Sequence, residues 1–143
     1  MFLGEYRHSL DEKGRVTVPI RLREGLSSAL FLTRGHDTNL ILFPQAAWDE
    51  LGRRLGQMPT TSHERRVYTR WIMGGATEVG LDKAGRILVP AHLREYAEMD
   101  GEVVFVGADE VIELWSPERW QLELARNREE LKSVLSGVSK MGV

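Results

Sequence analysis

Apolar and polar residues alternate over short distances in the first third of the chain, a pattern typical of β-strands. The runs are rich in β-branched and aromatic side chains, and polar turns with glycine separate them. The pattern predicts four strands, at about 5–10, 15–18, 29–33 and 40–43. Pro19 ends the second strand, and a short helical turn is predicted over 20–25.

Apolar residues at helical spacing follow the predicted strands. Trp48, Leu51 and Leu55 predict a helix that begins at Pro44, because proline suits the first turn of a helix. The residues 58–62 combine proline, threonine and serine and predict a loop after this helix.

Two later segments have the same periodicity and clear ends. Ser62 is a good N-cap for a helix that ends at Gly74-Gly75. The last helix is predicted over about 117–135, with Ser116 as its N-cap and Gly137 as its end. The apolar stripes are Val67, Tyr68, Trp71 and Ile72 in the first helix, and Trp120, Leu124, Leu131 and Leu135 in the second. We interpret these stripes as packing surfaces, either against the chain's own core or against another subunit.

The chain contains an internal repeat. The segment Leu10-Asp-Glu-Lys-Gly-Arg-Val-Thr-Val-Pro19 aligns with Leu81-Asp-Lys-Ala-Gly-Arg-Ile-Leu-Val-Pro90, and similar apolar runs follow in the same order. The predicted organisation is repeat 1 over 4–48, a connecting helical segment over 49–74, repeat 2 over 75–120, and a C-terminal helix and tail over 121–143. Because a unit of about 45 residues buries little surface alone, we expect the two repeats to pack on each other about a pseudo-twofold axis.

The charge balance is mildly acidic, with 19 Lys and Arg against 21 Asp and Glu and a net charge of −2. This is not the strong positive excess of a simple nucleic-acid binder. The charges are unevenly distributed, since residues 1–25 contain five bases and four acids, whereas residues 100–115 contain five acids and no base. A positive surface is therefore possible if the first region faces a polyanion and the second faces away; an ordinary mixed surface fits the same numbers.

Several classes of protein are disfavoured by what the sequence lacks. There is no cysteine, so neither a disulfide scaffold nor a thiolate metal site can form, and no apolar run approaches the length of a membrane span. The N-terminus has no signal-peptide core, which favours a cytoplasmic location. The four histidines are scattered, and no phosphate-binding loop, dinucleotide fingerprint or nucleophile elbow is present. We expect no cofactor and no enzymatic activity.

The repeated motif is that of a known family. Asp11 to Arg15 and Asp82 to Arg86 each lie inside Leu-Asp-x-x-Gly-Arg, and this pair resembles the two SpoVT-AbrB domains of the MraZ family of transcriptional regulators. The opening Met1-Phe-Leu-Gly-Glu-Tyr, the link Gly75-Ala-Thr-Glu and the stretch Leu93-Arg-Glu-Tyr-Ala are similar to the same family. The resemblance covers most of residues 1–120.

The resemblance implies a fold and a function. It implies an α+β chain in which two AbrB-like repeats interleave as a pseudo-twofold swapped-hairpin β-barrel, with peripheral helices. Members of the family form ring-shaped homo-oligomers and bind repeated promoter elements in double-stranded DNA. They act mainly as repressors of the division and cell-wall gene cluster that includes their own gene, and they associate with the nucleoid.

The two motif arginines are the first candidates for DNA contact. A guanidinium can fork to a phosphate or to the O6 and N7 edge of guanine, and a tight hairpin would hold it in place. We expect Asp11 and Asp82 to orient Arg15 and Arg86, and Gly14 and Gly85 to permit the turns. Further phosphate contacts are expected from Lys13, Lys83, Arg7, Arg21 and Arg23.

Two alternatives stay open at this point. The aspartate and arginine of each motif could form an ion pair that only fixes the hairpin. The chain could also be an AbrB-like interaction scaffold or antitoxin-like module without specific DNA binding. Because residues 76–99 contain three bases and four acids, we hypothesise that the first repeat is the main DNA reader.

Overall fold

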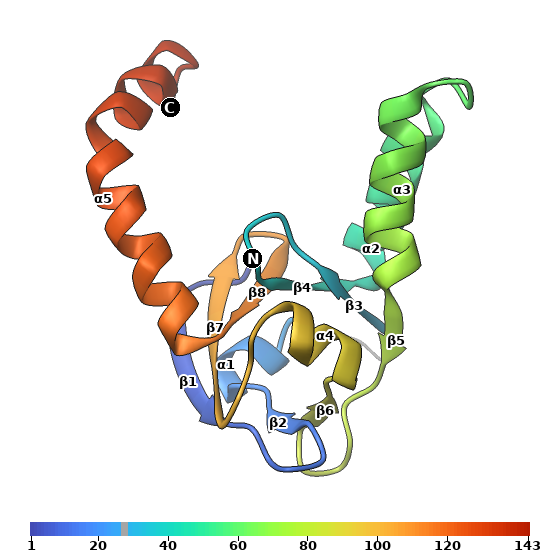
Figure 1. Ribbon diagram of the computed structural model, residues 1–143, viewed down its shortest axis with the longest axis vertical. Helices are drawn as coiled ribbons and strands as arrows, with labels where there is room; N and C mark the ends of the chain where they lie inside the picture. The colour runs from blue at the N-terminus through green and yellow to red at the C-terminus, as the bar shows by residue number, and fades with distance from the viewer. Residues whose placement is uncertain (27–28) are drawn as a thin grey trace.

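The computed structural model describes residues 1–26 and 29–143, and the same succession of elements occurs twice (Figure 1). The first repeat consists of β1 (Glu5–Ser9), β2 (Arg15–Thr17), α1 (Ile20–Arg23), β3 (Leu30–Arg34), β4 (Leu40–Pro44) and α2 (Gln45–Gly56). The second consists of β5 (Thr77–Val79), β6 (Arg86–Leu88), α4 (Ala91–Tyr96), β7 (Glu102–Ala108), β8 (Val111–Trp115) and α5 (Pro117–Lys140). Helix α3 (His63–Gly75) connects them.

The strands of the two repeats are interleaved within one antiparallel sheet. Its order is β1-β7-β8-β4-β3-β5, so each outer strand pairs with a strand of the other repeat. A second, two-stranded ribbon joins β2 of the first repeat to β6 of the second. Exchanging the repeats leaves both strand orders unchanged, which is the pseudo-twofold relation that the sequence repeat predicts.

The prediction of an α+β chain with two repeated units and an antiparallel sheet is confirmed, but the described strands do not close into a barrel. The six-stranded sheet and the ribbon are separate ladders, and between β1 and β2 only the single bridge Leu10↔Val16 forms. The short ribbon has a physical cause. Beyond Val18 and Val89 the chain leaves the ribbon at Pro19 and Pro90 and enters α1 and α4, which begin one residue later.

The core lies between the inner face of the sheet and the ribbon. Val16 and Ile87 at the centre of the ribbon are 1% exposed, and Val18 and Val89 beyond them are fully buried. They pack in one cluster with the inward-facing residues of the sheet, among them Leu32, Leu42, Phe105, Ile112 and Leu114. The predicted alternation of the strands is therefore correct, because the residues between these buried ones face outward.

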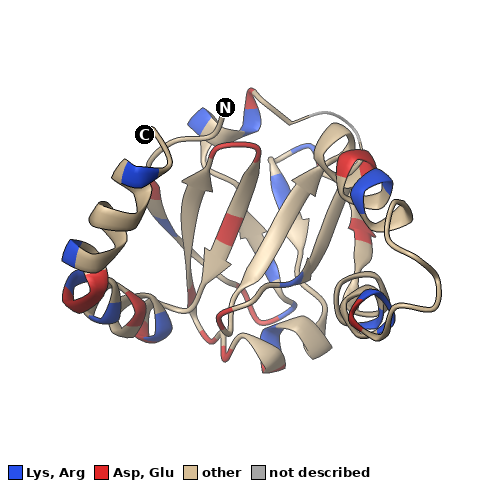
Figure 2. Cartoon of the chain, turned by 90° about the horizontal axis from the view of Figure 1, so that it is seen from above, with Lys and Arg blue, Asp and Glu red and all other residues tan. Residues whose placement is uncertain are grey.

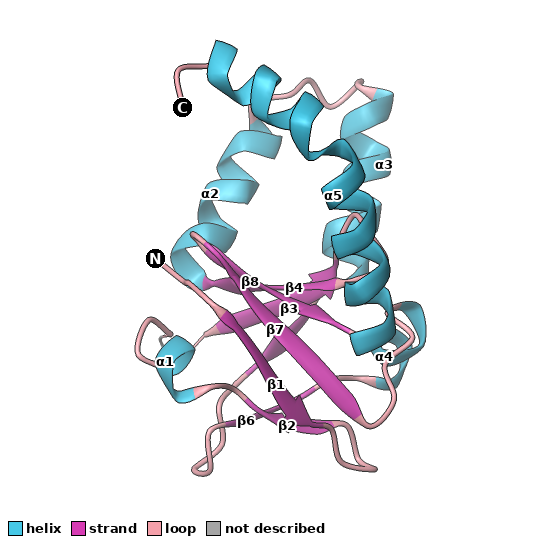
Figure 3. Cartoon of the chain, turned by 90° about the vertical axis from the view of Figure 1, so that its left-hand side faces the viewer, coloured by secondary structure: helices cyan, strands magenta, loops and turns pink. Residues whose placement is uncertain are grey.

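Two helical arms project from the sheet on the side away from the ribbon (Figures 1 and 3). One arm is the pair α2 and α3, and the other is α5. Tryptophans at the base of each arm pack on the outer face of the sheet: Trp48 stacks on Phe31 at 4.9 Å between ring centroids, and Trp120 packs on Trp115 at 5.3 Å. None of the described helices is long and apolar enough to cross a membrane.

Several helix ends differ by one or a few residues from the prediction: Pro44 is the N-cap of α2 and not its first residue, and α1 ends at Arg23. The hydroxyls of Ser62 and Ser116 accept hydrogen bonds from the backbone N–H of Arg65 and Arg119, as expected of N-caps. The prediction that Gly137 ends the last helix is wrong, since α5 continues to Lys140. A glycine inside a helix costs about 1 kcal/mol relative to alanine, which weakens the helix without breaking it.

Candidate nucleic-acid interface

The outer face of the ribbon carries both motif arginines. In the antiparallel register Arg15 is opposite Leu88 and Arg86 is opposite Thr17, while Val16 and Ile87 between them point into the core. The four flanking side chains therefore share the outer face. Arg15 and Arg86 are diagonal neighbours, for which the Cα–Cα separation is typically about 7–8 Å. One small surface thus presents one guanidinium from each repeat.

The carboxylate of Asp11 organises the turn that precedes Arg15. Its Oδ1 accepts hydrogen bonds from the backbone N–H of Lys13 at 3.0 Å and of Arg15 at 2.8 Å. Its Oδ2 accepts from Nε of Arg15 at 2.7 Å, which completes an ion pair. A single carboxylate therefore closes the turn and fixes the arginine that leaves it.

The second repeat has the same arrangement. Oδ1 of Asp82 accepts from the backbone N–H of Ala84 and of Arg86, both at 2.9 Å, and Oδ2 accepts from Nε of Arg86 at 2.8 Å. The predicted pairing of aspartate and arginine is thus present in both motifs. The expectation that Asp11 and Asp82 orient the arginines agrees with this geometry.

Each arginine uses only Nε in its ion pair. Within residues 1–26 and 29–143, no hydrogen-bond partner is found for the terminal Nη atoms of Arg15 or Arg86. The two side chains are 38% and 36% exposed. The forked end of each guanidinium is therefore accessible to an external acceptor, while its stem is held by the aspartate.

The hydrogen bonds depress the pKa of both aspartates. The backbone N–H of Arg15 is the main cause of the lowered pKa of Asp11, with further contributions from the Arg15 side chain and from Lys13. The backbone N–H of Arg86 has the same effect on the pKa of Asp82. Both carboxylates are therefore ionised at neutral pH, as the ion pairs require.

Both turns need glycine, as predicted. Gly14 and Gly85 have φ of 89° and 77°, a region that is costly for other residues. A Cβ on Gly14 would lie 2.6 Å from the carbonyl oxygen of Val89, and a Cβ on Gly85 would collide with the guanidinium of Arg23. The close contacts come from the other repeat in each case.

The structure brings some of the remaining predicted residues to this surface. Lys13 and Lys83 are exposed within the turns, which lie at the end of the molecule away from the arms (Figure 1). Arg21 is exposed on α1. Arg23 lies against Gly85 and is only partly exposed.

Arg7 is not part of this surface. It lies on β1 opposite Val104, and Val104 packs with Trp120 of α5 on the outer face of the sheet. Because directly opposed residues share a face, Arg7 points to the side of the sheet that α5 occupies.

The acidic stretch 100–115 is divided between two ends of the molecule. Asp109 and Glu110 form the turn between β7 and β8, and Glu110 lines a depression together with Met1 and Glu50 of α2, on the arm side. Asp100 and Glu102 lie instead near the end of β1, where Gly101 accepts a hydrogen bond from Leu10. Asp109 and Glu110 therefore face away from the ribbon, as expected of this acidic region. Asp100 and Glu102, at the beginning of β7, do not.

Sequence reasoning missed Arg94. This residue of α4 lies beside Gly14 of the first repeat and donates a hydrogen bond from Nε to the carbonyl of Val89 at 3.0 Å. The signal was available, since Leu22-Arg23 aligns with Leu93-Arg94 in the repeat. Among the described residues there is no group of three or more histidines or carboxylates able to hold a metal ion.

Comparison with known proteins identifies the family. A family model described as "MraZ protein, putative antitoxin-like" matches the chain twice, over residues 1–71 and 72–135. A relative from Herpetosiphon aurantiacus named "Transcriptional regulator MraZ" is 45% identical over 143 residues, which is 100% of both chains. Relatives of the same name from Roseiflexus castenholzii and Halothermothrix orenii are 46% identical over 85% of both chains and 40% identical over 100% of both chains.

A solution structure from Pyrococcus horikoshii was also matched, over 80% of this chain and 88% of that chain. Its TM-score of 0.34 and sequence identity of 12% are too low to support any inference. The sequence comparisons are decisive by themselves, because they extend over the whole chain and both repeats. This chain belongs to the MraZ family.

Proposed function

We propose that the chain is a sequence-specific DNA-binding transcriptional regulator, and that the outer face of the β2–β6 ribbon is its DNA-contacting surface. The relatives are named transcriptional regulators, which favours this class over an enzyme. The observation that carries the proposal is the pair of accessible guanidinium groups, one from each repeat, each held by an aspartate. As in the family resemblance, the target is repeated promoter elements, and the effect is repression of a division and cell-wall gene cluster that includes its own gene.

The chemistry of the ribbon suits a DNA groove. A guanidinium whose Nε is already paired keeps two Nη donors, enough for a bidentate contact with guanine or a phosphate. Lys13, Lys83 and Arg21 would add phosphate contacts, which raise affinity without selecting a sequence. Arg23 packs against Gly85 instead and is not counted among these contacts. On this proposal residues 4–48 and 75–120 are two SpoVT-AbrB repeats, and their interleaved hairpins contact DNA as one unit. The protein then acts in the cytoplasm, at the nucleoid.

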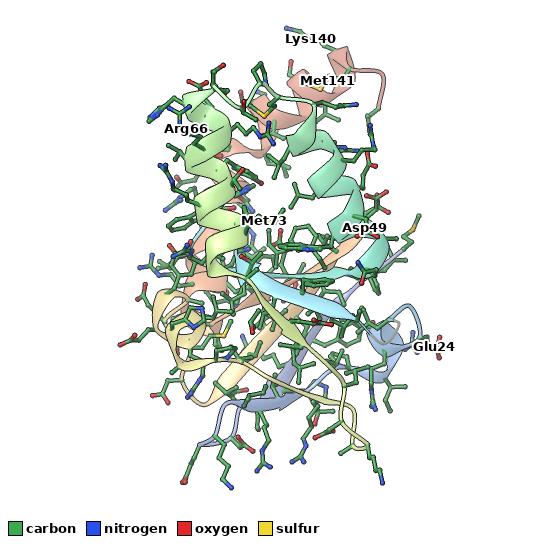
Figure 4. All side chains as sticks on the ribbon, turned by 90° about the vertical axis from the view of Figure 1, so that its right-hand side faces the viewer. Glu24, Asp49, Arg66, Met73, Lys140 and Met141 are labelled. Atoms are coloured by element: carbon green, nitrogen blue, oxygen red, sulfur yellow. The ribbon has the colours of Figure 1, made fainter. Side chains whose placement is uncertain are left out.

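We infer that copies of the chain associate through the arms. Beyond Leu124 the apolar stripe of α5 has no partner among the described residues, and Leu131, Val134 and Leu135 are each about half exposed, at 49%, 50% and 57%. On α3, Val67, Tyr68 and Trp71 line an aromatic pocket with His36. Arg66 at the tip of α3 and Lys140 near the end of α5 lie at the same end of the molecule (Figure 4).

The two arm surfaces differ, which favours a ring over a simple dimer. The exposed stripe of α5 is aliphatic, whereas the α3 pocket is lined mainly by aromatic rings, with Glu64 at its edge. Viewed from the arm side, both arms carry acids and bases intermixed (Figure 2). A contact between two different faces of identical chains repeats head to tail, and it closes as a ring when the rotations between successive copies add up to a full turn. A ring offers many weak DNA contacts together, which compensates for a net charge of −2.

Assembly is tested with Leu131→Asp and with Leu122→Asp as the matched control. Both leucines are exposed on α5, but they are nine positions apart and therefore lie on opposite faces of the helix. Light scattering should give a lower mass for Leu131→Asp only. An unchanged mass for Leu131→Asp contradicts the proposed interface.

DNA binding is tested by measuring the affinity of Arg15→Ala and Arg86→Ala for duplex DNA from upstream of the chain's own gene. Arg53→Ala is the control, because Arg53 is also in an exposed ion pair, 2.6 Å from Glu50, but lies on an arm. We expect a loss of about 10- to 100-fold for Arg15→Ala, since one good bidentate contact is worth about 1–3 kcal/mol. A smaller loss is expected for Arg86→Ala, and an equal or larger one refutes the first repeat as main reader.

The alternative function is an interaction scaffold or antitoxin-like module, a possibility that the description of the family model also contains. Salt distinguishes the two. Binding to phosphates releases counterions from the DNA, and this release contributes less free energy as the salt concentration rises, so the affinity falls steeply with salt. If no upstream fragment binds specifically even at low salt, the scaffold function is correct and the regulator function is wrong.

A further inference from the structure

The two turns of the ribbon are not supported equally, although the repeats are similar in sequence. Each turn is contacted by an arginine from the short helix of the other repeat: Arg94 lies beside Gly14, and Arg23 lies beside Gly85. Each site is therefore built from both halves of the chain. The difference is in the hydrogen bonds that these two arginines make.

Arg94 is tied to the first turn through one backbone segment. Its Nε donates to the carbonyl of Val89 at 3.0 Å, and the N–H of Val89 donates to the carbonyl of Gly14 at 2.8 Å. Val89 is fully buried, so this short chain of hydrogen bonds is anchored in the core. It ends one residue before Arg15.

The second turn has only one of these two hydrogen bonds. The N–H of Val18 donates to the carbonyl of Gly85 at 2.9 Å, which matches the bond between Val89 and Gly14. However, Nε of Arg23 is buried and has no hydrogen-bond partner among the described residues. The turn that carries Arg86 thus lacks the tie that the turn carrying Arg15 has.

The surroundings of Arg94 also argue against a direct contact with DNA. Arg94 lines a surface depression together with Glu95, Glu98 and Asp100. Carboxylates at this position repel a phosphate, so the site is electrostatically unsuited to the DNA backbone. The role that fits Arg94 is to hold the turn, since its Nε is already bonded.

We propose that Arg94 of the second repeat is a positioning residue for the first repeat's DNA-reading turn, and that this tie, which Arg23 does not make, keeps Arg15 better ordered than Arg86. The inference rests on the proposed function, because it assumes that the ribbon contacts DNA. Order in the free protein lowers the entropy lost on binding. The better order of Arg15 is therefore a structural reason for the first repeat to contribute more to DNA binding than the second.

The test uses Arg94→Lys with Arg23→Lys as the matched control. Lysine keeps the positive charge but has a methylene where arginine has Nε, so only the bond to Val89 is lost. Arg94→Lys should lower DNA affinity by about two- to tenfold, the equivalent of one hydrogen bond. Arg23→Lys removes an Nε that has no partner, and its affinity should stay within about twofold of the wild type.

Double variants separate positioning from direct contact. In an Arg15→Ala background, Arg94→Lys should lower the DNA affinity almost no further, because the side chain that Arg94 positions is gone. In an Arg86→Ala background, Arg94→Lys should lower the DNA affinity by the same factor as it does in the wild type. Equal losses in the two backgrounds, or equal effects of Arg94→Lys and Arg23→Lys, overturn the proposal.

A measurement without DNA distinguishes failure of this inference from failure of the proposed function. Hydrogen exchange of the free protein should become faster in residues 10–18 of Arg94→Lys and at the amide of Val89, which donates to Gly14. It should stay unchanged in the second turn, residues 81–85. If the wild type binds no DNA, the reader role is wrong and exchange alone decides whether the tie exists. Unchanged exchange in residues 10–18 contradicts the tie.

Discussion

At the scale of single residues, one carboxylate in each motif has two tasks. Asp11 closes a turn through two backbone N–H groups and holds the side chain of Arg15 through Nε. The ion pair is more than a third exposed, so the charge attraction itself contributes little to stability. Its value is geometric, since it fixes the stem of an arginine while leaving the forked end accessible.

The titration of Asp11 tests this division of tasks. Its lowered pKa arises first from the backbone N–H of Arg15, which an alanine would keep. Arg15→Ala should therefore raise the pKa of Asp11 only part of the way to its ordinary value. Because the folded-state pKa is depressed, the contribution of Asp11 to stability is complete above its unfolded-state pKa and disappears as pH falls through the folded-state pKa.

Carbon-13 NMR of the Asp11 carboxyl group between neutral and strongly acidic pH measures this shift. Asp82 in the same Arg15→Ala sample is an internal reference, because its pKa is lowered by Arg86 instead. A complete return of the Asp11 pKa to its ordinary value would show that the side chain, and not the turn, holds the carboxylate.

Gly14→Ala tests the requirement for glycine in the first turn. The variant places a Cβ at a φ of 89° and 2.6 Å from the carbonyl of Val89. We expect the free energy of unfolding to fall by about 1–2 kcal/mol from the backbone conformation alone, before the clash is counted. Gly52→Ala on α2 is the control, since its Cβ meets nothing within 4 Å, and its stability should rise slightly in a chemical denaturation experiment. Equal stabilities of the two variants would contradict this account.

At the scale of elements, α3 shows how a helix end is satisfied by a neighbouring strand. The last carbonyls of a helix lack intrahelical partners. Here Thr33 of β3 donates its hydroxyl hydrogen to the carbonyl of Ile72 at 2.5 Å, and Arg34 donates to the carbonyl of Trp71 at 3.1 Å. The guanidinium of Arg34 also lies 4.3 Å from the centroid of the Trp71 ring. These bonds fix the angle at which this arm leaves the sheet.

Thr33→Val tests the anchoring of α3. Valine has a similar shape but leaves the buried carbonyl of Ile72 without its donor, so the free energy of unfolding should fall by about 1–3 kcal/mol. Thr60→Val in the exposed loop before α3 is the matched control and should be nearly neutral. Denaturant titration of both proteins measures the difference, and a neutral Thr33→Val would mean that the bond carries no net stability.

The sequence predicted these elements unevenly. The strands, the N-caps Ser62 and Ser116 and both glycine turns were predictable, because each depends on local pattern and backbone geometry. The end of α5 was not, since Gly137 is compatible with either a helix end or a helix interior. The role of Arg94 was not predicted either, because it depends on contacts between segments about 80 residues apart in the chain.

At the scale of the whole molecule, neither repeat is a complete unit. β1 hydrogen-bonds along its length to β7, β3 pairs on one side with β5, and β2 forms its ladder with β6. Each half therefore leaves sheet edges and one face of the ribbon open when it is alone. Duplication in the sequence predicted this mutual dependence. It did not predict that the sheet and the ribbon stay separate ladders, because the chain leaves the ribbon for α1 and α4 after only a few residues.

Separation of the halves tests this dependence. Fragments 1–74 and 75–143 should each be largely unfolded as monomers, because an isolated half loses its strand partners and about half of its core. Mixing them should restore the circular dichroism spectrum of the full chain. A cooperatively folded monomeric 1–74 fragment would show that the interleaved pairing is dispensable.

The central claim is that the outer face of the ribbon, and not the arms, meets DNA. The most direct test is hydrogen exchange of the full chain with and without upstream duplex DNA, followed by peptide. We predict slower exchange on DNA binding in residues 10–18 and 81–89, with little change in α3 and α5. Slower exchange confined to the arms, with both turns unaffected, would contradict the account.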